Sequence, residues 1–164
     1  MEYSLRDVTP GDQPFLFRLY ASTREQEIAA WGWEATQSEA FLRMQFQAQQ
    51  ASYNHMYPAA EHQIVMLDGE PAGRILVAED DAEIRLVDIA LLNEFRNRRL
   101  GESLMRRLME QSLQKSKPLR LQVLQRNPAR HLYDRLRFRV TAQDQMYVSM
   151  EWVPVLAKAP SGEQ

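Results

Sequence analysis

Hydrophobic positions along the chain follow two periods, and the changes between them predict the elements. Alternation and short apolar runs predict strands, and spacings of three and four predict helices. The predicted strands cover residues 3–8, 62–67, 72–78, 83–92, 119–124, 138–140 and 146–152. The predicted helices run from the turn at 9–12 to about residue 23, from 37 or 38 to about 58, and over 101–116 and 128–136. A D-G turn signal at Asp68-Gly69 joins the second and third strands.

This order of elements predicts an α/β protein. One strand, two helices, three strands, a helix, a strand, a helix and closing strands fit a central mixed sheet with helices on both faces. A length of 164 residues favours one domain, which we place at 1–153. The segment 154–164, with Pro160, Ser161 and Gly162, is predicted to be a flexible tail.

Composition removes several classes of function. The formal charge of −2 disfavours nucleic acid as a partner, and the chain has no cysteine for a disulfide, a thiolate metal site or a nucleophile. The three histidines are scattered, so we expect no metal. The N-terminus lacks signal-peptide features and no apolar run approaches 18 residues, so we expect a cytoplasmic protein without a membrane segment.

The segment from Asp88 to Leu104 carries the most information about chemistry. An apolar strand runs into a basic turn that opens an amphipathic helix at about Gly101. The unpaired N–H groups and the dipole of a helix start favour an anion, most readily phosphate, and the arginines of the turn would add charge. The alternative is a solvated helix start with surface arginines.

Two segments together resemble the GNAT superfamily of acetyl-CoA-dependent N-acetyltransferases. The family's pyrophosphate motif Q/R-x-x-G-x-G/A is similar to the sequence from Arg96 to Gly101, and N-P-A-x-x-L-Y-x-x-L-G-F to that from Asn127 to Phe138. The resemblance covers most of residues 62–152 and implies a mostly antiparallel mixed sheet. Arg99 and Arg137 stand where the family has glycine. If position 99 needs positive φ, its side chain costs about 1 kcal/mol.

The resemblance implies a cofactor site for acetyl-CoA. Main-chain amides of the turn would hold the pyrophosphate, the strand end at 89–91 would pair with the pantetheine arm, and Asn127 would help to place the cofactor. The implied cofactor residues are Ile89, Ala90, Leu91, Arg96, Asn97, Arg98, Arg99, Leu100, Gly101, Glu102, Ser103 and Asn127. Tyr133 would lie near the sulfur.

The chemistry needs a proton donor and a proton acceptor. A phenol such as Tyr133 can protonate the departing thiolate, although the residue could instead be a packed helix tyrosine. The attacking amine must be neutral, so a base is required, and Asp88 or Glu83 could act through water. Asp88 could equally be a structural partner of Arg85 or a backbone cap.

The acceptor, an amine of a small molecule, peptide or protein, would enter over residues 24–57. The candidate substrate residues are Arg24, Glu25, Trp31, Gln45, Gln49 and Tyr53. Trp31 and Trp33 could cover a cationic acceptor or pack as a core or lid, and Gln45 and Gln49 share a helix face that could line a pocket or meet solvent. A non-catalytic acyl-CoA-binding or structural module of the same fold is the alternative function. An RNA-directed enzyme is disfavoured by charge. A homodimer is one option among the oligomeric states left open.

Overall fold

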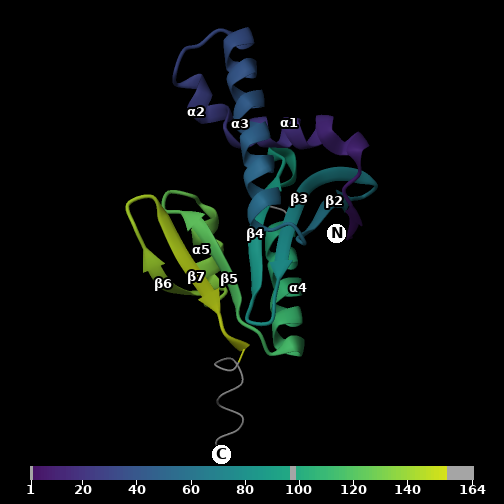
Figure 1. Cartoon of the computed structure of the whole chain (residues 1–164), viewed down its shortest axis with the longest axis vertical. Coiled ribbons are helices and arrows are strands. Elements are labelled where there is room, and N and C mark those ends of the chain that lie inside the picture. The colour runs from purple at the N-terminus through teal and green to yellow at the C-terminus, as the bar shows by residue number, and fades with distance from the viewer. Residues whose placement is uncertain (1, 97–98, 155–164) are drawn as a thin grey trace, which may run out of the picture. The chain divides into compact units, whose positions relative to one another are not determined.

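The computed structural model describes residues 2–96 and 99–154, in five α-helices and seven strands within those ranges (Figure 1). The helices are α1 Gln13–Thr23, α2 Glu25–Ala29, α3 Ala35–Met56, α4 Leu100–Lys115 and α5 Ala129–Arg135. The strands are β1 Tyr3–Asp7, β2 Glu61–Leu67, β3 Glu70–Glu79, β4 Ile84–Leu91, β5 Leu119–Leu124, β6 Arg139–Gln143 and β7 Tyr147–Trp152. Two 3₁₀ turns, Pro10–Asp12 and Asn93–Phe95, precede α1 and follow β4.

The strands form one mixed sheet in the order β1-β2-β3-β4-β5-β7-β6. The pairs β1–β2, β5–β7 and β6–β7 are antiparallel, whereas β4 and β5 are parallel. The parallel register joins Ile84–Leu86, the first three residues of β4, to Leu119–Leu121. The predicted α/β class with a mixed, mostly antiparallel sheet is confirmed.

Most predicted elements occur within a few residues of their expected bounds. The exception is α2, which forms inside the 24–35 segment that we expected to be a connection between helices. The predicted tail at 154–164 lies outside the described residues, except for its first residue.

The chain divides into two compact units. The first unit comprises residues 1–76 and 88–97, and the second comprises 77–87 and 98–164. Among the described residues, the first unit holds six arginines and twelve carboxylates, a net charge of −6. The second holds twelve basic and nine acidic residues, a net charge of +3. The near-neutral total therefore hides two units of opposite charge. The prediction of a single domain stays a prediction.

The core of the first unit lies where α1 and α3 pack on β2. Leu16, Phe46 and Ile64 are almost completely buried there, and Phe17 and Tyr20 place their ring centroids 5.7 Å from that of Phe46. Burying these side chains contributes about 1.5–3 kcal/mol each. This contact holds α1 and α3 against β2.

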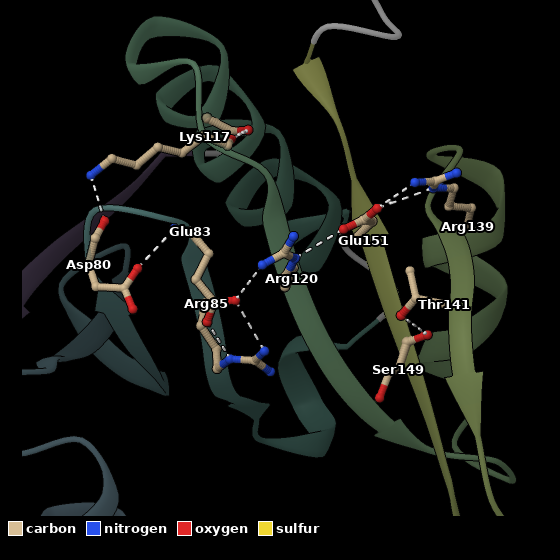
Figure 2. Close-up of polar contacts among 10 residues, drawn as sticks. Asp80, Glu83, Arg85, Lys117, Arg120, Arg139, Thr141, Ser149 and Glu151 are labelled. Atoms are coloured by element: carbon tan, nitrogen blue, oxygen red, sulfur yellow. Dashed lines mark hydrogen bonds and ion pairs between the residues drawn. The ribbon is translucent and has the colours of Figure 1, made fainter.

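The second unit buries the apolar side of α4, including Leu104 and Met105, and alternate residues of β5 and β7. A ladder of ion pairs crosses its strands, as Figure 2 shows. Glu83 bonds Arg85 and Arg120, and Glu151 bonds Arg120 and Arg139. We call these five residues the ion-pair ladder. It spans β4, β5, β7 and β6 with alternating charge.

Arg99 and Arg137 both adopt left-handed backbone conformations, with φ of 60° and 73°. These are the two positions at which the GNAT motifs carry glycine. An L side chain in this region costs about 1–2 kcal/mol, whereas glycine adopts it freely. The conditional expectation for Arg99 is therefore met.

The substitution Arg137→Gly is expected to stabilise the fold. Relief of the left-handed strain exceeds the extra entropy that glycine gives the unfolded chain, so the gain is about 0.5–1 kcal/mol. The midpoint temperature of thermal unfolding should rise by about 2–4 °C for each kcal/mol gained in a chain of this size. Arg130→Gly, which places glycine in α5 instead, is the control and should lower the midpoint. A midpoint for Arg137→Gly below that of the unchanged protein would contradict the strain argument.

Candidate active site

The end of β4 is held by two polar contacts inside the first unit. The Leu92 N–H donates to the Ala72 carbonyl at 2.9 Å, which ties the strand end to β3. The Arg96 Nε donates to the Leu91 carbonyl at 3.1 Å. Arg96, predicted to face the phosphates, therefore also supports the strand that was predicted to receive the pantetheine arm. Its other guanidinium nitrogens have no bond to a described residue.

The start of α4 offers main-chain donors. Arg99 precedes the helix and makes no side-chain hydrogen bond to the first turn, so the N–H groups of Leu100, Gly101 and Glu102 lack that cap. The Ser103 N–H donates within the helix to the Arg99 carbonyl at 3.0 Å. These donors and the helix dipole suit an anion. The predicted residues Asn97 and Arg98 lie outside the described residues.

Glu102 is the one carboxylate in the first turn of α4. Its carboxylate bonds Arg135 at 3.1 Å and Arg106 at 3.0 Å. The bond from Arg135, followed by that from Arg106, holds the pKa of Glu102 below its usual value. Because two arginines surround it, this carboxylate adds little repulsion against a phosphate at the helix start.

Asn127 and Tyr133 come from the motif around α5. Asn127 Oδ1 accepts a hydrogen bond from the Ala129 N–H at 2.9 Å, at the start of α5. Tyr133 is buried, at 4% exposure, and its ring centroid lies 5.7 Å from that of Phe138. The packing expected of a structural tyrosine is therefore present. A role for its hydroxyl in proton transfer stays a prediction.

A buried arginine organises the polar side chains of the first unit. Arg74 of β3 is 5% exposed and donates through Nε and Nη2 to Asp88 Oδ2 at 2.8 and 2.5 Å. Its Nη2 also donates to Gln49 Oε1 at 3.0 Å, and its Nη1 lies 3.4 Å from His62 Nε2. The partner of Asp88 is therefore Arg74, and the proposed pairing with Arg85 was wrong, because Arg85 bonds Glu83.

The two candidate bases differ in the oxygen atoms that they keep free. Both bonds from Arg74 fall on Asp88 Oδ2, and Oδ1 has no hydrogen bond to any described residue. In Glu83, Arg85 reaches both oxygens and Arg120 bonds Oε1. Burial raises the pKa of Glu83, but the bonds from Arg85 and Arg120 outweigh it, so the net pKa lies below its usual value. Asp88 is therefore the better placed carboxylate.

His62 stays neutral at physiological pH. Burial, followed by the charge of Arg74, lowers its pKa from 6.5 to about 4. The unfolded chain takes up a proton below about pH 6.5, whereas the folded protein does not until about pH 4. The stability that the folded state gains from a neutral His62 is therefore fully present above pH 6.5, and it is lost as the pH falls toward 4.

We expect His62→Gln to reduce the loss of stability between pH 6.5 and 4. Urea unfolding at half-unit steps of pH measures the free energy of unfolding. Plotted against pH, this free energy should have a smaller slope for the variant than for the unchanged protein. His55→Gln is the matched control, because His55 is exposed at the end of α3. Equal slopes for His62→Gln and the unchanged protein would refute the assignment.

A cleft of about 190 Å³ opens beside the last turns of α3, and we call it the α3 cleft. It is lined by Gln13, Gln50, Tyr53, Asn54, Tyr57, Pro58, Ala60, His62, Arg74 and Leu76. The guanidinium carbon of Arg74 lies 5.7 Å from the ring centroid of Tyr53. Two predicted substrate residues thus meet Arg74: Tyr53 lines the cleft, and Gln49 bonds the guanidinium.

The other predicted substrate residues lie elsewhere in the first unit. Arg24 bonds Glu27 at 2.7 Å and the Tyr20 hydroxyl at 2.8 Å. Trp31 packs with Trp33 and Phe41, at centroid distances of 4.9 and 5.5 Å. The three rings form a cluster in which Trp31 and Trp33 stay 41% and 39% exposed. The guanidinium carbon of Arg24 lies 5.8 Å from the Phe41 ring centroid. Glu25 is exposed and Gln45 half-buried, and neither lines the α3 cleft.

Sequence reasoning missed Arg74 and His62. The usable signal was an arginine within the apolar run from Ala72 to Ala78, which is as costly to bury alone as Asp88 in the next strand. Two opposite charges in neighbouring strands of a hairpin predict a pair. Among the described residues, no group of three histidine or acidic side chains is arranged to hold a metal. The described helices include none with the length and hydropathy to cross a membrane.

Comparison with solved structures defines the class of the fold. PaiA N-acetyltransferase from Thermoplasma acidophilum, in complex with coenzyme A, is 16% identical with a TM-score of 0.70, over 93% of this chain and 99% of that chain. An acetyltransferase from Thermus thermophilus is 20% identical with a TM-score of 0.67, over 93% and 97%. The ribosomal-protein-S18-alanine N-acetyltransferase from Escherichia coli is 16% identical with a TM-score of 0.61, over 93% and 94%. The fold is that of an N-acetyltransferase.

The sequence agrees with this class. The profile of the Acetyltransferase (GNAT) family matches residues 18–138, and the chain belongs to that family. No curated protein matches the chain significantly. The protein is thus an acyltransferase, and the resemblance seen in its two motifs is confirmed.

Proposed function

We propose that the protein transfers an acetyl group from acetyl-CoA to an amine by direct attack, with Tyr133 protonating the thiolate that leaves. The observation that carries this proposal is the uncapped start of α4 at Leu100–Gly101, with Glu102 held by Arg106 and Arg135. Such a helix start suits a diphosphate. The family match supports acetyl transfer.

The residues present fit coenzyme A. The second unit carries a net charge of +3 over its described residues, which favours a strongly anionic cofactor, and PaiA N-acetyltransferase has been solved with coenzyme A. The amides of Leu100, Gly101 and Glu102, with Asn97, Arg98 and Arg99, would hold the pyrophosphate, and Ser103 and Asn127 would support the site. Ile89, Ala90 and Leu91 would bond the pantetheine arm as a strand does. Bound there, the cofactor supplies the thioester.

Asp88 is our candidate for the proton acceptor. Its Oδ1 has no partner among the described residues, while the two bonds from Arg74 to Oδ2 hold the carboxylate in place. A carboxylate in this state can receive a proton from the acceptor ammonium directly or through one water. Glu83 is the weaker candidate, because two arginines occupy its oxygens.

The acceptor would bind in the first unit, with the α3 cleft receiving the part of the molecule beyond the amine. The net charge of −6 over the described residues of this unit draws a cationic amine. Gln49 and Tyr53 would contact the acceptor together with Arg74 and His62. Arg24, Glu25, Trp31 and Gln45 would contact only a longer acceptor, such as a peptide.

Binding and turnover test the proposal separately. Isothermal calorimetry with coenzyme A and thermal shift with acetyl-CoA should show saturable binding. Thiol release across a panel of monoamines, polyamines and peptides should then show turnover. Stabilisation by acetyl-CoA with no thiol release from any amine would favour the alternative, a non-catalytic acyl-CoA-binding module. No coenzyme A binding at millimolar ligand would overturn both.

A further inference from the structure

Gly73 lies within β3 at a point where the backbone of β4 leaves no room for a side chain. A Cβ built on Gly73 would lie 2.2 Å from the Ala90 carbonyl oxygen, 2.7 Å from Leu91 Cδ2 and 3.0 Å from Leu91 Cα. Non-bonded carbon atoms reach their optimal separation at about 3.5–4.0 Å. Two of these three atoms belong to the main chain, so a side-chain rotation cannot relieve the overlap. Any other residue at 73 must push β3 and β4 apart.

Backbone conformation does not explain this glycine. The glycines with positive φ among the described residues are Gly32 and Gly69, which lie in turns. Gly73 has a φ that every residue adopts, so its missing side chain matters for space alone. A glycine inside a strand is the residue expected where another backbone approaches closely.

The backbone that Gly73 admits is the one proposed to pair with the pantetheine arm. Ala90 and Leu91 belong to that segment, and they are positioned from two sides. On one side are Gly73 and the bond from the Leu92 N–H to the Ala72 carbonyl, and on the other is the bond from Arg96 Nε to the Leu91 carbonyl. All these residues belong to the first unit.

From this geometry we infer that Gly73 is a positioning residue for coenzyme A: its lack of a side chain sets the place of the Ala90–Leu91 backbone that bonds the pantetheine arm. The inference rests on the proposed function and extends it to a residue of β3, a strand to which that proposal assigns no contact with the cofactor. Hydrogen bonds weaken steeply as donor and acceptor move out of alignment, so displacing this backbone weakens binding of the pantetheine arm.

A unique dipeptide allows the effect to be observed in the unchanged protein. Ala72-Gly73 is the single Ala–Gly pair among the six glycines of the sequence. Labelling alanine with ¹³C at the carbonyl and glycine with ¹⁵N therefore gives one cross-peak in an HNCO spectrum, and that peak is the Gly73 amide. We expect it to shift as coenzyme A is titrated, with the dissociation constant found by calorimetry. Adenosine 3′,5′-bisphosphate, which lacks the pantetheine arm, should leave the peak in place.

The variant Gly73→Ala gives the functional measurement. At a temperature where circular dichroism shows it folded, its dissociation constant for coenzyme A should rise at least about tenfold. The KM for acetyl-CoA should rise with it. Gly11→Ala is the matched control, because a Cβ on Gly11 would meet only Thr9 Oγ1, at 3.8 Å. A fold defect alone would leave the affinity of the folded fraction unchanged.

Each possible result either supports or overturns the inference about Gly73. A Gly73 peak that stays in place at saturating coenzyme A, or a folded Gly73→Ala that binds coenzyme A within twofold of the unchanged protein, overturns the inference and leaves the proposed function intact. If Gly73→Ala does not fold, the HNCO titration decides alone. Failure of the unchanged protein to bind coenzyme A overturns the proposed function, and this inference with it.

Discussion

Replacing Tyr133 by phenylalanine should lower kcat by about 100-fold or more and leave the affinity for coenzyme A nearly unchanged. A positioned general acid contributes about 10²–10⁴-fold, and phenylalanine removes the proton donor alone. The ring of Tyr133 is buried against Phe138, so phenylalanine keeps that packing. Steady-state kinetics with saturating amine, together with calorimetry, measure the two quantities.

The control for this prediction separates chemistry from packing. Phe138→Leu alters the neighbouring ring and leaves the hydroxyl of Tyr133 in place, so it should lower the unfolding midpoint with a much smaller effect on kcat. If Tyr133→Phe turns over within a few-fold of the unchanged protein, the phenol has a structural role only and another group protonates the thiolate.

Replacing Arg74 by methionine should destabilise the protein by about 3 kcal/mol. Removing one partner of a buried pair leaves the other charge uncompensated, at a cost of about 3–5 kcal/mol. The side chain of Arg74 is 6% exposed and that of Asp88 26%, so some solvent reaches Asp88 and the lower end of the range applies. Gln49 also loses the guanidinium that it bonds. Urea denaturation at neutral pH measures the loss.

A double-mutant cycle tests the cause of this loss. Arg74→Met with Asp88→Leu removes both charges, and replacement of a whole buried pair by apolar residues is often close to neutral. The double variant should therefore be more stable than Arg74→Met alone, and inactive if Asp88 takes the proton. Additive losses in the two single variants would show that the pair is not coupled, and the account of Asp88 as held by Arg74 would fall.

Periodicity predicted the strands and long helices well, because each buries one regular face. Leu119–Leu124 was predicted with its observed bounds, since its apolar residues alternate with Arg120 and Gln122 between Pro118 and Gln125. The helix α2, with five residues, escaped notice because so short an element shows barely one turn of any period. The packing of Trp31 and Trp33 with Phe41 was one of the two alternatives that the sequence left open.

The parts of the candidate site that consist of neighbouring residues in the sequence could be predicted, whereas contacts between residues far apart in the sequence could not. The basic turn before Gly101 and the segment from Asn127 to Phe138 are local, and both were recognised from short motifs. The bonds from Arg74 to Asp88, Gln49 and His62 join β3, β4, α3 and β2, and no spacing along the chain encodes them. The close approach at Gly73 likewise depends on how two strands pack.

The ion-pair ladder also has a consequence for self-association. The outer strand β6 has all five residues exposed, and its unpaired edge is the kind of template on which sheets of different molecules join and aggregate. Glu151 holds Arg139 through two hydrogen bonds, at 3.2 and 2.7 Å, and so fixes a charged side chain on that outer strand. A neighbouring molecule could extend the sheet only by desolvating this arginine. The contacts that join β6 to β7 therefore also help to prevent a strand of another molecule from pairing with the β6 edge.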